Sequence, residues 1–212
     1  MKIYDVQQGS DAWKTIRLGI PTASRFDEIL TPSTRKLSKS SGKYACELLA
    51  GLLLGESLDS ASSGYMERGT AMEAEAASWY EFTRGVEAKT IGFVTLDDGS
   101  AGCSPDRCVG DDGLLEIKCP GAVVHLQNLL SMTEQYACQV QGQLWICERK
   151  WCDLLTYHPT LPSACVRIER DEEFIAALAG AVEMFTETMD DHRTQLQKLG
   201  CIFPAKKIAQ AA

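Results

Sequence analysis

The sequence predicts an α/β fold with a central mixed β-sheet flanked by helices, and two observations support this class. Helical patterns before residue 86 give way at 86–118 to short strand-like segments separated by turns, and a second strand pair within 151–170 lies between two further helical regions. Elements in this order pack as layers around one sheet. The 212 residues fit one good-sized domain, so we assign 1–212 to a single domain.

The helices are predicted from strong helix formers and from the residues at their ends. Gly55 and Gly85 stand where the first two helices stop, as glycine often does after a helix. The basic, Ser-rich segment 31–43 ahead of them is expected to be a mobile loop. The four helices are expected at 45–55, 66–85, about 122–148 and 171–199.

The strands are predicted from turn signals that divide apolar runs. DDGS (97–100) and GDDG (110–113) are typical turn sequences. The runs beside them are EAKTIGFVTL, SAGCSPDRCVG and LLEIKC, and a later pair is WCDLLTYHP (151–159) and ACVRIER (164–170).

Composition indicates a soluble globular protein with reduced cysteines. Apolar residues make up 45% and charged residues 24% of the chain, and no apolar run is long enough to span a bilayer. The N-terminus lacks the apolar core of a secretory signal, so we expect a cytoplasmic protein. The nine cysteines include no CxxC pair, which argues against a zinc site and favours small core residues.

The net charge of −8 argues mildly against a protein that binds DNA through a broadly basic surface. The charge is unevenly distributed, however. Residues 1–50 contain eight Lys or Arg against five acidic residues, so the negative charge lies in the remainder. An acidic metal site there would add to it.

Residues 104–120, SPDRCVGDDGLLEIKCP, place two carboxylates and a lysine on the arms of a predicted hairpin. Glu116 and Lys118 are two residues apart on a strand and therefore point to the same face, and Asp106 lies on the other arm. Carboxylate oxygens are the ligands that Mg²⁺ takes, and bound Mg²⁺ activates water and offsets charge at a phosphate. Lys118 can orient that water or stabilise the developing charge. The pattern therefore favours phosphodiester hydrolysis.

The position of Asp106 relative to Glu116 depends on the length of the turn. A three-residue loop or a bulge places Asp106 opposite Glu116, whereas a four-residue loop places it opposite Ile117. The sequence leaves both open. An exposed hairpin in which Glu116 and Lys118 form a solvated ion pair is also compatible with so short a motif.

The segment resembles the PD…ExK signature of the restriction-endonuclease-like nucleases, and its neighbours resemble the lambda exonuclease family, the YqaJ-type viral recombinases. The similar blocks occur in the family's order and cover about residues 8–160. They are QGSDAWKTIRLGIPTAS (8–24), ERGTAMEAEA (67–76), AGCSPD with LEIKCP, and YACQVQGQLWI (136–146). The resemblance implies a restriction-endonuclease-like core.

The resemblance implies a magnesium centre at the hairpin. Its metal ligands correspond to Asp106, Glu116 and the Ile117 carbonyl, and its catalytic lysine corresponds to Lys118. Two Mg²⁺ ions are implied, with Mn²⁺ as a possible substitute.

Two helices are expected to complete this centre. The family's acidic helix places Glu73 beside the second metal ion, although Glu75 could also face inward on an amphipathic helix. The family's active-site glutamine corresponds to Gln139, and a surface amide would be an equally ordinary role for it. Many relatives have glycine after the PD aspartate. Arg107 stands there in this chain, where it could contact DNA or point to solvent.

The family holds the 5′-phosphate of a DNA strand in a small pocket, which corresponds to Arg17, Ser24 and Ser104. An arginine offers forked donors to phosphate oxygens, and hydroxyls add neutral donors. Ordinary roles are a surface ion pair for the arginine, a helix N-cap for Ser24 and a turn for Ser104. Trp13 is expected in the core.

The resemblance implies a 5′→3′ exonuclease that degrades one strand of double-stranded DNA from its ends to 5′-mononucleotides, leaving a 3′ strand for a single-strand annealing protein. Arg35 in the 31–43 segment and Met66 are expected to contact DNA. A homotrimeric ring and a phage or prophage origin in a bacterial cell are also implied. The alternatives are an endonuclease or junction resolvase with the same core, and a non-catalytic recombination scaffold. A 5′-phosphate pocket favours the exonuclease.

Overall fold

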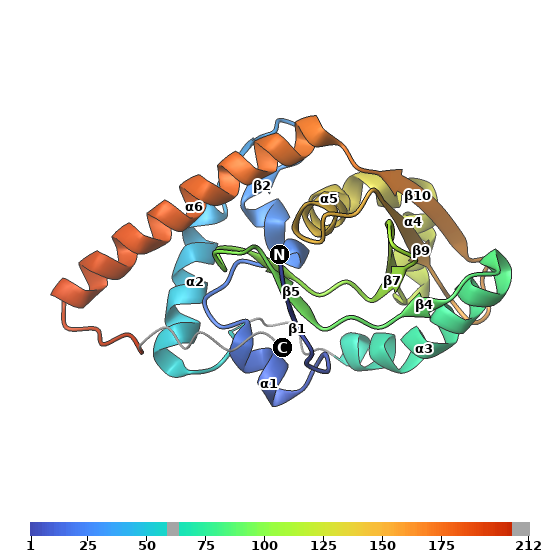
Figure 1. The fold of residues 1–212 in the computed structure, drawn as a ribbon, viewed down its shortest axis with the longest axis horizontal. Helices are drawn as coiled ribbons and strands as arrows, with labels where there is room; N and C mark the ends of the chain where they lie inside the picture. Colours follow the sequence, from blue (N-terminus) through green and yellow to red (C-terminus); the bar gives the residue numbers. More distant parts are fainter. Residues whose placement is uncertain (59–63, 205–212) are drawn as a thin grey trace.

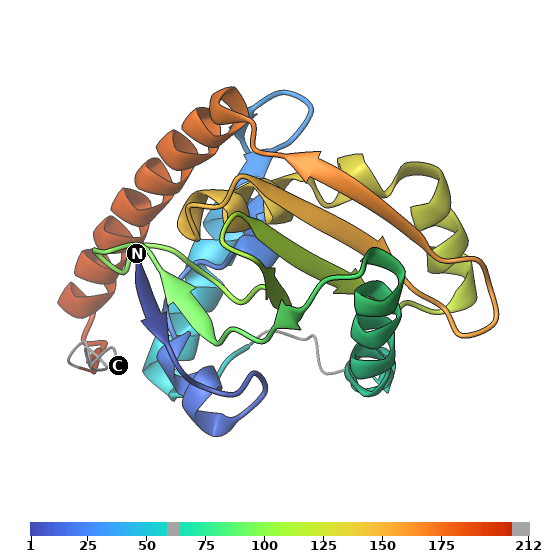
Figure 2. The same ribbon diagram turned by 45° about the vertical axis from the view of Figure 1, so that its right-hand side comes forward.

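The computed structural model describes residues 1–58 and 64–204, with side chains described for 1–58 and 72–204. A five-stranded sheet with the order β10-β9-β8-β7-β4 lies at its centre (Figures 1 and 2). The pair β8–β9 is parallel and the other pairs are antiparallel, so the predicted mixed sheet is confirmed. The strands are β4 (Ala88–Lys89), β7 (Arg107–Val109), β8 (Gly113–Lys118), β9 (Trp151–Thr156) and β10 (Ala164–Glu169).

Helices cover both faces of this sheet, and β8 is accordingly buried on both faces. Leu115 and Ile117 pack with Tyr80 of α3 (Gly64–Arg84), whereas Leu114 packs in the larger core with Leu144 of α5 (Ala137–Ile146). This larger core also contains buried residues of α2 (Ser41–Leu54) and α6 (Glu172–Lys198). Helices α2 and α3 end at glycines with positive φ, 75° at Gly55 and 66° at Gly85, which confirms both predicted ends.

A separate three-stranded sheet with the order β1-β5-β6 was not predicted. Its strands are β1 (Lys2–Tyr4), β5 (Phe93–Thr95) and β6 (Gly102–Cys103). Strands of two or three residues are too short to show an alternating pattern. The same holds for α1 (Asp11–Ile16) and the 3₁₀ helix η1 (Ala23–Glu28), each only six residues long.

Two expectations about local structure are wrong. The segment 31–43 is no irregular loop, because β2 (Leu30–Thr31) and β3 (Lys36–Leu37) form a hairpin and α2 begins at Ser41. The turn is closed by the Arg35 amide, which donates to the Thr31 carbonyl at 2.9 Å. The helix expected at 122–148 is two helices, α4 (Ala122–Gln135) and α5, which meet at Tyr136 without a glycine or proline to mark the break.

Candidate active site

The β7–β8 hairpin settles the position of Asp106. Val109 pairs with Gly113, so the loop has three residues, and Gly110 within it has a φ of 56°. Arg107 pairs with Leu115, which places Asp106 one residue beyond the ladder, beside Glu116. The Ile117 amide donates to Asp106 Oδ2 at 2.6 Å and fixes the carboxylate there.

Glu116 is the centre of a hydrogen-bonded cluster. Its side chain accepts hydrogen bonds from Lys118 Nζ at 2.7 Å, Gln139 Nε2 at 2.6 Å and Gln143 Nε2 at 2.7 Å. The Lys118 ammonium also donates to Gln139 Oε1 at 2.9 Å. Glu116 and Lys118 therefore share one face, as predicted, and they form a buried cluster rather than a solvated pair, since Glu116 is 4% exposed.

The two glutamines reach Glu116 because they lie four residues apart on one face of α5. Of the two, only Gln139 was selected from the sequence. Gln141 points elsewhere and donates to the Glu169 carbonyl at 2.9 Å. Helical spacing from Gln139 is the signal that could have identified Gln143.

Burial and neighbouring carboxylates together set the electrostatics of the site. Burial raises the pKa of Asp106 well above its ordinary value, and the negative charges of Glu116 and Glu73 raise it further. Burial alone would lower the pKa of Lys118, but Glu116 and Asp106 outweigh burial and raise that pKa. The lysine is thus held protonated beside Glu116 and Asp106.

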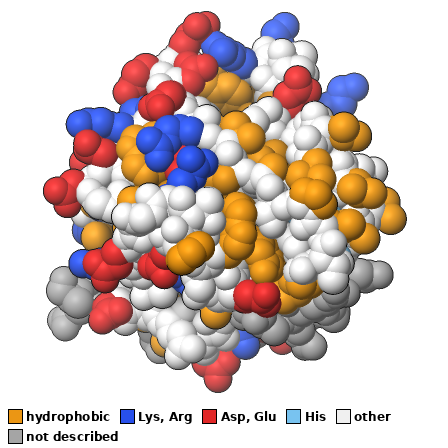
Figure 3. Space-filling model, turned by 90° about the vertical axis from the view of Figure 1, so that its right-hand side faces the viewer, with side chains coloured by type: hydrophobic (Ala, Val, Ile, Leu, Met, Phe, Trp, Pro, Cys, Tyr) orange, Lys and Arg blue, Asp and Glu red, His pale blue; other side chains and the backbone are white. Residues whose placement is uncertain are grey.

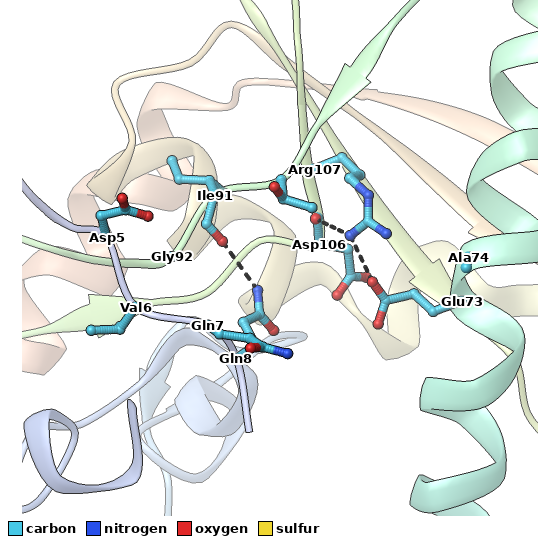
Figure 4. A pocket seen from close by; sticks show the side chains of 11 residues that line it. Asp5, Val6, Gln7, Gln8, Glu73, Ala74, Ile91, Gly92, Asp106 and Arg107 are labelled. Carbon is cyan, nitrogen blue, oxygen red and sulfur yellow. Dashed lines mark hydrogen bonds and ion pairs between the residues drawn. The ribbon is translucent and has the colours of Figure 1, made fainter. Parts of the chain in front are cut away.

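Glu73 of α3 lies on the same side as Asp106, across an ion pair with Arg107 (Figure 4). Arg107 Nη1 lies 2.6 Å from Glu73 Oε1, whereas the Glu75 side chain accepts a hydrogen bond from the Tyr157 hydroxyl at 2.8 Å. Of the two candidate glutamates, the structure places Glu73 at the site. An open cavity of about 400 Å³ lies against these residues and is also lined by the segment Asp5–Gln8, which the sequence analysis did not select.

The three predicted phosphate-binding residues lie close together. Arg17 Nη2 donates to Thr22 Oγ1 at 3.3 Å, and Thr22 Oγ1 lies 3.2 Å from Ser24 Oγ. Ser104 Oγ accepts a hydrogen bond from Trp13 Nε1 at 2.8 Å. Arg17, Ser24 and Ser104 are therefore connected through Trp13 and Thr22 rather than by direct contact.

Trp13 and Thr22 connect this group, and the sequence analysis did not select either residue. The Arg17 guanidinium lies 3.9 Å from the centre of the Trp13 ring, so Trp13 contacts both Arg17 and Ser104. Thr22 is buried between Arg17 and Ser24. The expectation that Trp13 is a core residue is wrong, because its indole is half-buried and contacts the site.

Of the two predicted DNA contacts, Arg35 lies on the β2–β3 turn. It pairs with Glu173 at 2.7 Å and with Asp171 at 3.6 Å, both at the start of α6. Met66 lies outside the residues whose side chains are described.

The donor set at the hairpin fits a hard divalent cation. Within the described residues, no three His, Cys, Asp or Glu side chains are grouped so that they could hold an ion. Glu73 is paired with Arg107, and Glu116 accepts three hydrogen bonds. Carboxylate oxygens are nevertheless the preferred ligands of Mg²⁺. Burial, and after it the negative charges of Glu116 and Glu73, raise the pKa of Asp106, and a bound cation would offset that repulsion.

Comparisons with known proteins agree with this architecture. The model of the YqaJ-like viral recombinase domain matches residues 12–150. The alkaline exonuclease LHK-Exo from Laribacter hongkongensis is 32% identical, with a TM-score of 0.78, over 89% of this chain and 97% of that chain. Its complex with dAMP aligns over the same shares at the same identity, with a TM-score of 0.79.

A phage-related exonuclease from Haemophilus somnus 129PT is 17% identical over 84% of this chain and 96% of that chain, with a TM-score of 0.66, and shares the fold. No curated protein matches. None of the described helices combines the length and apolarity needed to cross a membrane. The family model spans more than half of the sequence, and LHK-Exo aligns along nearly all of it. The chain, with its restriction-endonuclease-like α/β core, belongs to the YqaJ-like viral recombinase family.

Proposed function

We propose that this protein is a magnesium-dependent 5′→3′ exonuclease that degrades one strand of linear double-stranded DNA to 5′-mononucleotides. The observation that carries the proposal is the convergence of Asp106, Glu116 and Lys118 at the end of the β7–β8 hairpin. The similarity to an alkaline exonuclease, and to its complex with dAMP, supports the reaction class and a mononucleotide product.

The residues around the hairpin have separate tasks in the proposed reaction. Asp106, Glu116 and the Ile117 carbonyl would hold one Mg²⁺ or Mn²⁺ ion, and Glu73 would contribute to a second. A bound Mg²⁺ lowers the pKa of its water and neutralises charge on the phosphate. Lys118, held protonated, orients the attacking water or stabilises the developing negative charge. Gln139 orients both Glu116 and Lys118.

Direction requires recognition of one end of the strand. Arg17, Ser24 and Ser104 would bind the 5′-phosphate, with Trp13 and Thr22 holding them in place. Ser104 precedes Asp106 by two residues, so this pocket adjoins the reacting centre. Each cut leaves a new 5′-phosphate, which the pocket can take up in turn. This end recognition favours an exonuclease over an endonuclease or a junction resolvase.

Contacts farther along the duplex belong to the same proposal. Arg35 would leave its acidic partners on α6 to contact the duplex backbone, where arginine positions DNA without reading its sequence. Met66 would separate the terminal base pair.

A ring of three copies would keep the enzyme on DNA without a basic surface, and an annealing protein would receive the 3′ strand. Figure 3 shows apolar side chains spread over the face on the right of Figure 1, where α3, α4 and β10 lie. Along α4, Val123, Leu126 and Leu130 are 74%, 50% and 87% exposed. Exposed apolar surface of this kind is typical of protein interfaces and supports assembly.

The test is digestion of linear duplex DNA by the purified protein with Mg²⁺, beside Asp106→Ala. The wild type should release 5′-mononucleotides, and the variant should release none while melting at a similar temperature, because its substitution removes a repelled carboxylate. Cleavage by Asp106→Ala at a near wild-type rate would show that the catalytic centre lies elsewhere.

A further inference from the structure

Arg107 forms an ion pair with Glu73, the residue proposed above to contribute to a second metal ion. Its Nη1 atom lies 2.6 Å from Glu73 Oε1 and donates to the Asp106 carbonyl at 2.6 Å (Figure 4). The side chain is 14% exposed and that of Glu73 is 28% exposed, so the pair is largely shielded from water. Arg107 therefore links Glu73 of α3 to the Asp106 carbonyl of the hairpin.

The strand geometry explains this placement. Arg107 pairs with Leu115, whose side chain packs in the core beneath α3, and successive residues of a strand point to opposite faces. Arg107 is consequently directed toward α3, whereas Glu116 and Lys118 face α5. A guanidinium stays charged at every working pH, so Glu73 has a permanent counter-ion.

We propose that Arg107 is a resident cation that competes with a second divalent ion for Glu73 and so limits the DNA-free protein to one tightly bound ion. The inference rests on the proposed metal centre at Asp106 and Glu116. An ion that takes Glu73 Oε1 as a ligand must displace the guanidinium, and an ion that takes the other carboxylate oxygen would be repelled by it. Removing that positive charge should strengthen binding at the second position by about ten-fold or more, since the repulsion is doubled for a divalent ion.

The experiment is a titration of the DNA-free full chain with Mn²⁺, followed by the electron paramagnetic resonance signal of free Mn²⁺. Arg107→Gln, and independently Arg107→Ala, should bind a second ion at least about ten-fold more tightly than the wild type. Arg107→Lys keeps the charge and should resemble the wild type. Lys150→Ala is the matched control, because it removes the same charge from a surface pair with Asp112.

The double variant Arg107→Gln with Glu73→Gln separates the proposed competition from a general field effect. It should lose the second ion that Arg107→Gln gains. Equal titrations for the wild type, Arg107→Gln and Arg107→Ala would overturn the role of Arg107 while leaving the metal centre in place. A gain that persists in the double variant would also overturn it. If neither the wild type nor any variant bound Mn²⁺, the metal centre itself would fail, and the inference with it.

Discussion

Glu116 is buried and carries a negative charge, so its environment must compensate for lost hydration. Lys118 supplies the opposite charge, and the amides of Gln139 and Gln143 donate to the two carboxylate oxygens. Groups that hold a metal ligand in this way set its orientation as well as its charge, and the proposed ligand Glu116 is held so. The geometry of the proposed catalytic centre therefore depends on α5 as much as on the hairpin.

Gln143 gives the sharpest test at the scale of single residues. Gln143→Leu removes the donor to Glu116 Oε2 and should weaken Mn²⁺ binding about 10- to 100-fold, as loss of a ligand's supporting hydrogen bond does. Gln141→Leu is the matched control, because its amide bonds lead to Glu169 and Asp171 instead. Equal effects of the two substitutions on Mn²⁺ affinity, measured by titration, would exclude a positioning role for Gln143.

At the scale of elements, the proposed phosphate pocket depends on three segments meeting. Arg17 follows α1, Ser24 lies in η1 and Ser104 follows β6. The Gly102 amide donates to the Pro21 carbonyl at 3.0 Å and joins the segment before η1 to β6. A small pocket is thus held by main-chain contacts between parts of the chain far apart in sequence.

Arg17→Ala tests that pocket. A charge-assisted hydrogen bond contributes roughly 1.5–3 kcal/mol, so the variant should lose most of a preference of about 10- to 150-fold for 5′-phosphorylated over 5′-hydroxyl ends. Magnesium-dependent cleavage should persist, because Arg17 takes no part in the hairpin centre. The rates on the two kinds of end give the measurement. An undiminished preference in Arg17→Ala would remove the arginine from end recognition.

The elements also show how far the sequence can be used for prediction. Helices α2 and α3 and the β7–β8 hairpin have strong local signals in Gly55, Gly85 and GDDG, and they were predicted from these, although the length of the hairpin turn was left open. Such local signals are missing at β1, at α1 and at the break at Tyr136, because packing rather than local propensity determines these features. Asp106, Glu116 and Lys118 could be selected from a short motif.

Trp13 and the pairing of Arg107 with Glu73 could not be predicted in the same way. Each depends on a contact between segments that are distant in sequence. Strand alternation alone does not fix the partner of Arg107 until the turn length is known. The missing information is therefore tertiary register rather than residue chemistry.

At the scale of the whole molecule, Asp153 ties three elements of the sheet layer together. Its carboxylate accepts hydrogen bonds from Tyr80 of α3 and from Arg167 of β10. Burial alone would raise the pKa of Asp153, but these hydrogen bonds outweigh burial and lower it. A lowered pKa means that the carboxylate stabilises the fold above the ordinary aspartate range, and that this contribution is lost as pH falls through the folded-state pKa.

Asp153→Asn should therefore be less stable than the wild type near about pH 7, with the difference shrinking toward about pH 3. The expected loss at neutral pH is about 1–3 kcal/mol, the usual cost of breaking a buried hydrogen-bonded carboxylate. Urea unfolding of both proteins at several pH values measures it. A difference in unfolding free energy that stays constant with pH would contradict the assigned role of Asp153.

The whole chain carries a net charge of −8, so its action on DNA must come from a defined site rather than from a basic surface. The most direct test is digestion of three duplexes by the wild-type protein with Mg²⁺. One duplex is linear with 5′-phosphate ends, one is linear with 5′-hydroxyl ends, and one is a closed circle. The account predicts rapid digestion of the phosphorylated ends, slower digestion of the hydroxyl ends by about 10- to 150-fold, an intact circle, and no digestion with EDTA. Equal rates on both linear ends, or cleavage of the circle, would contradict it.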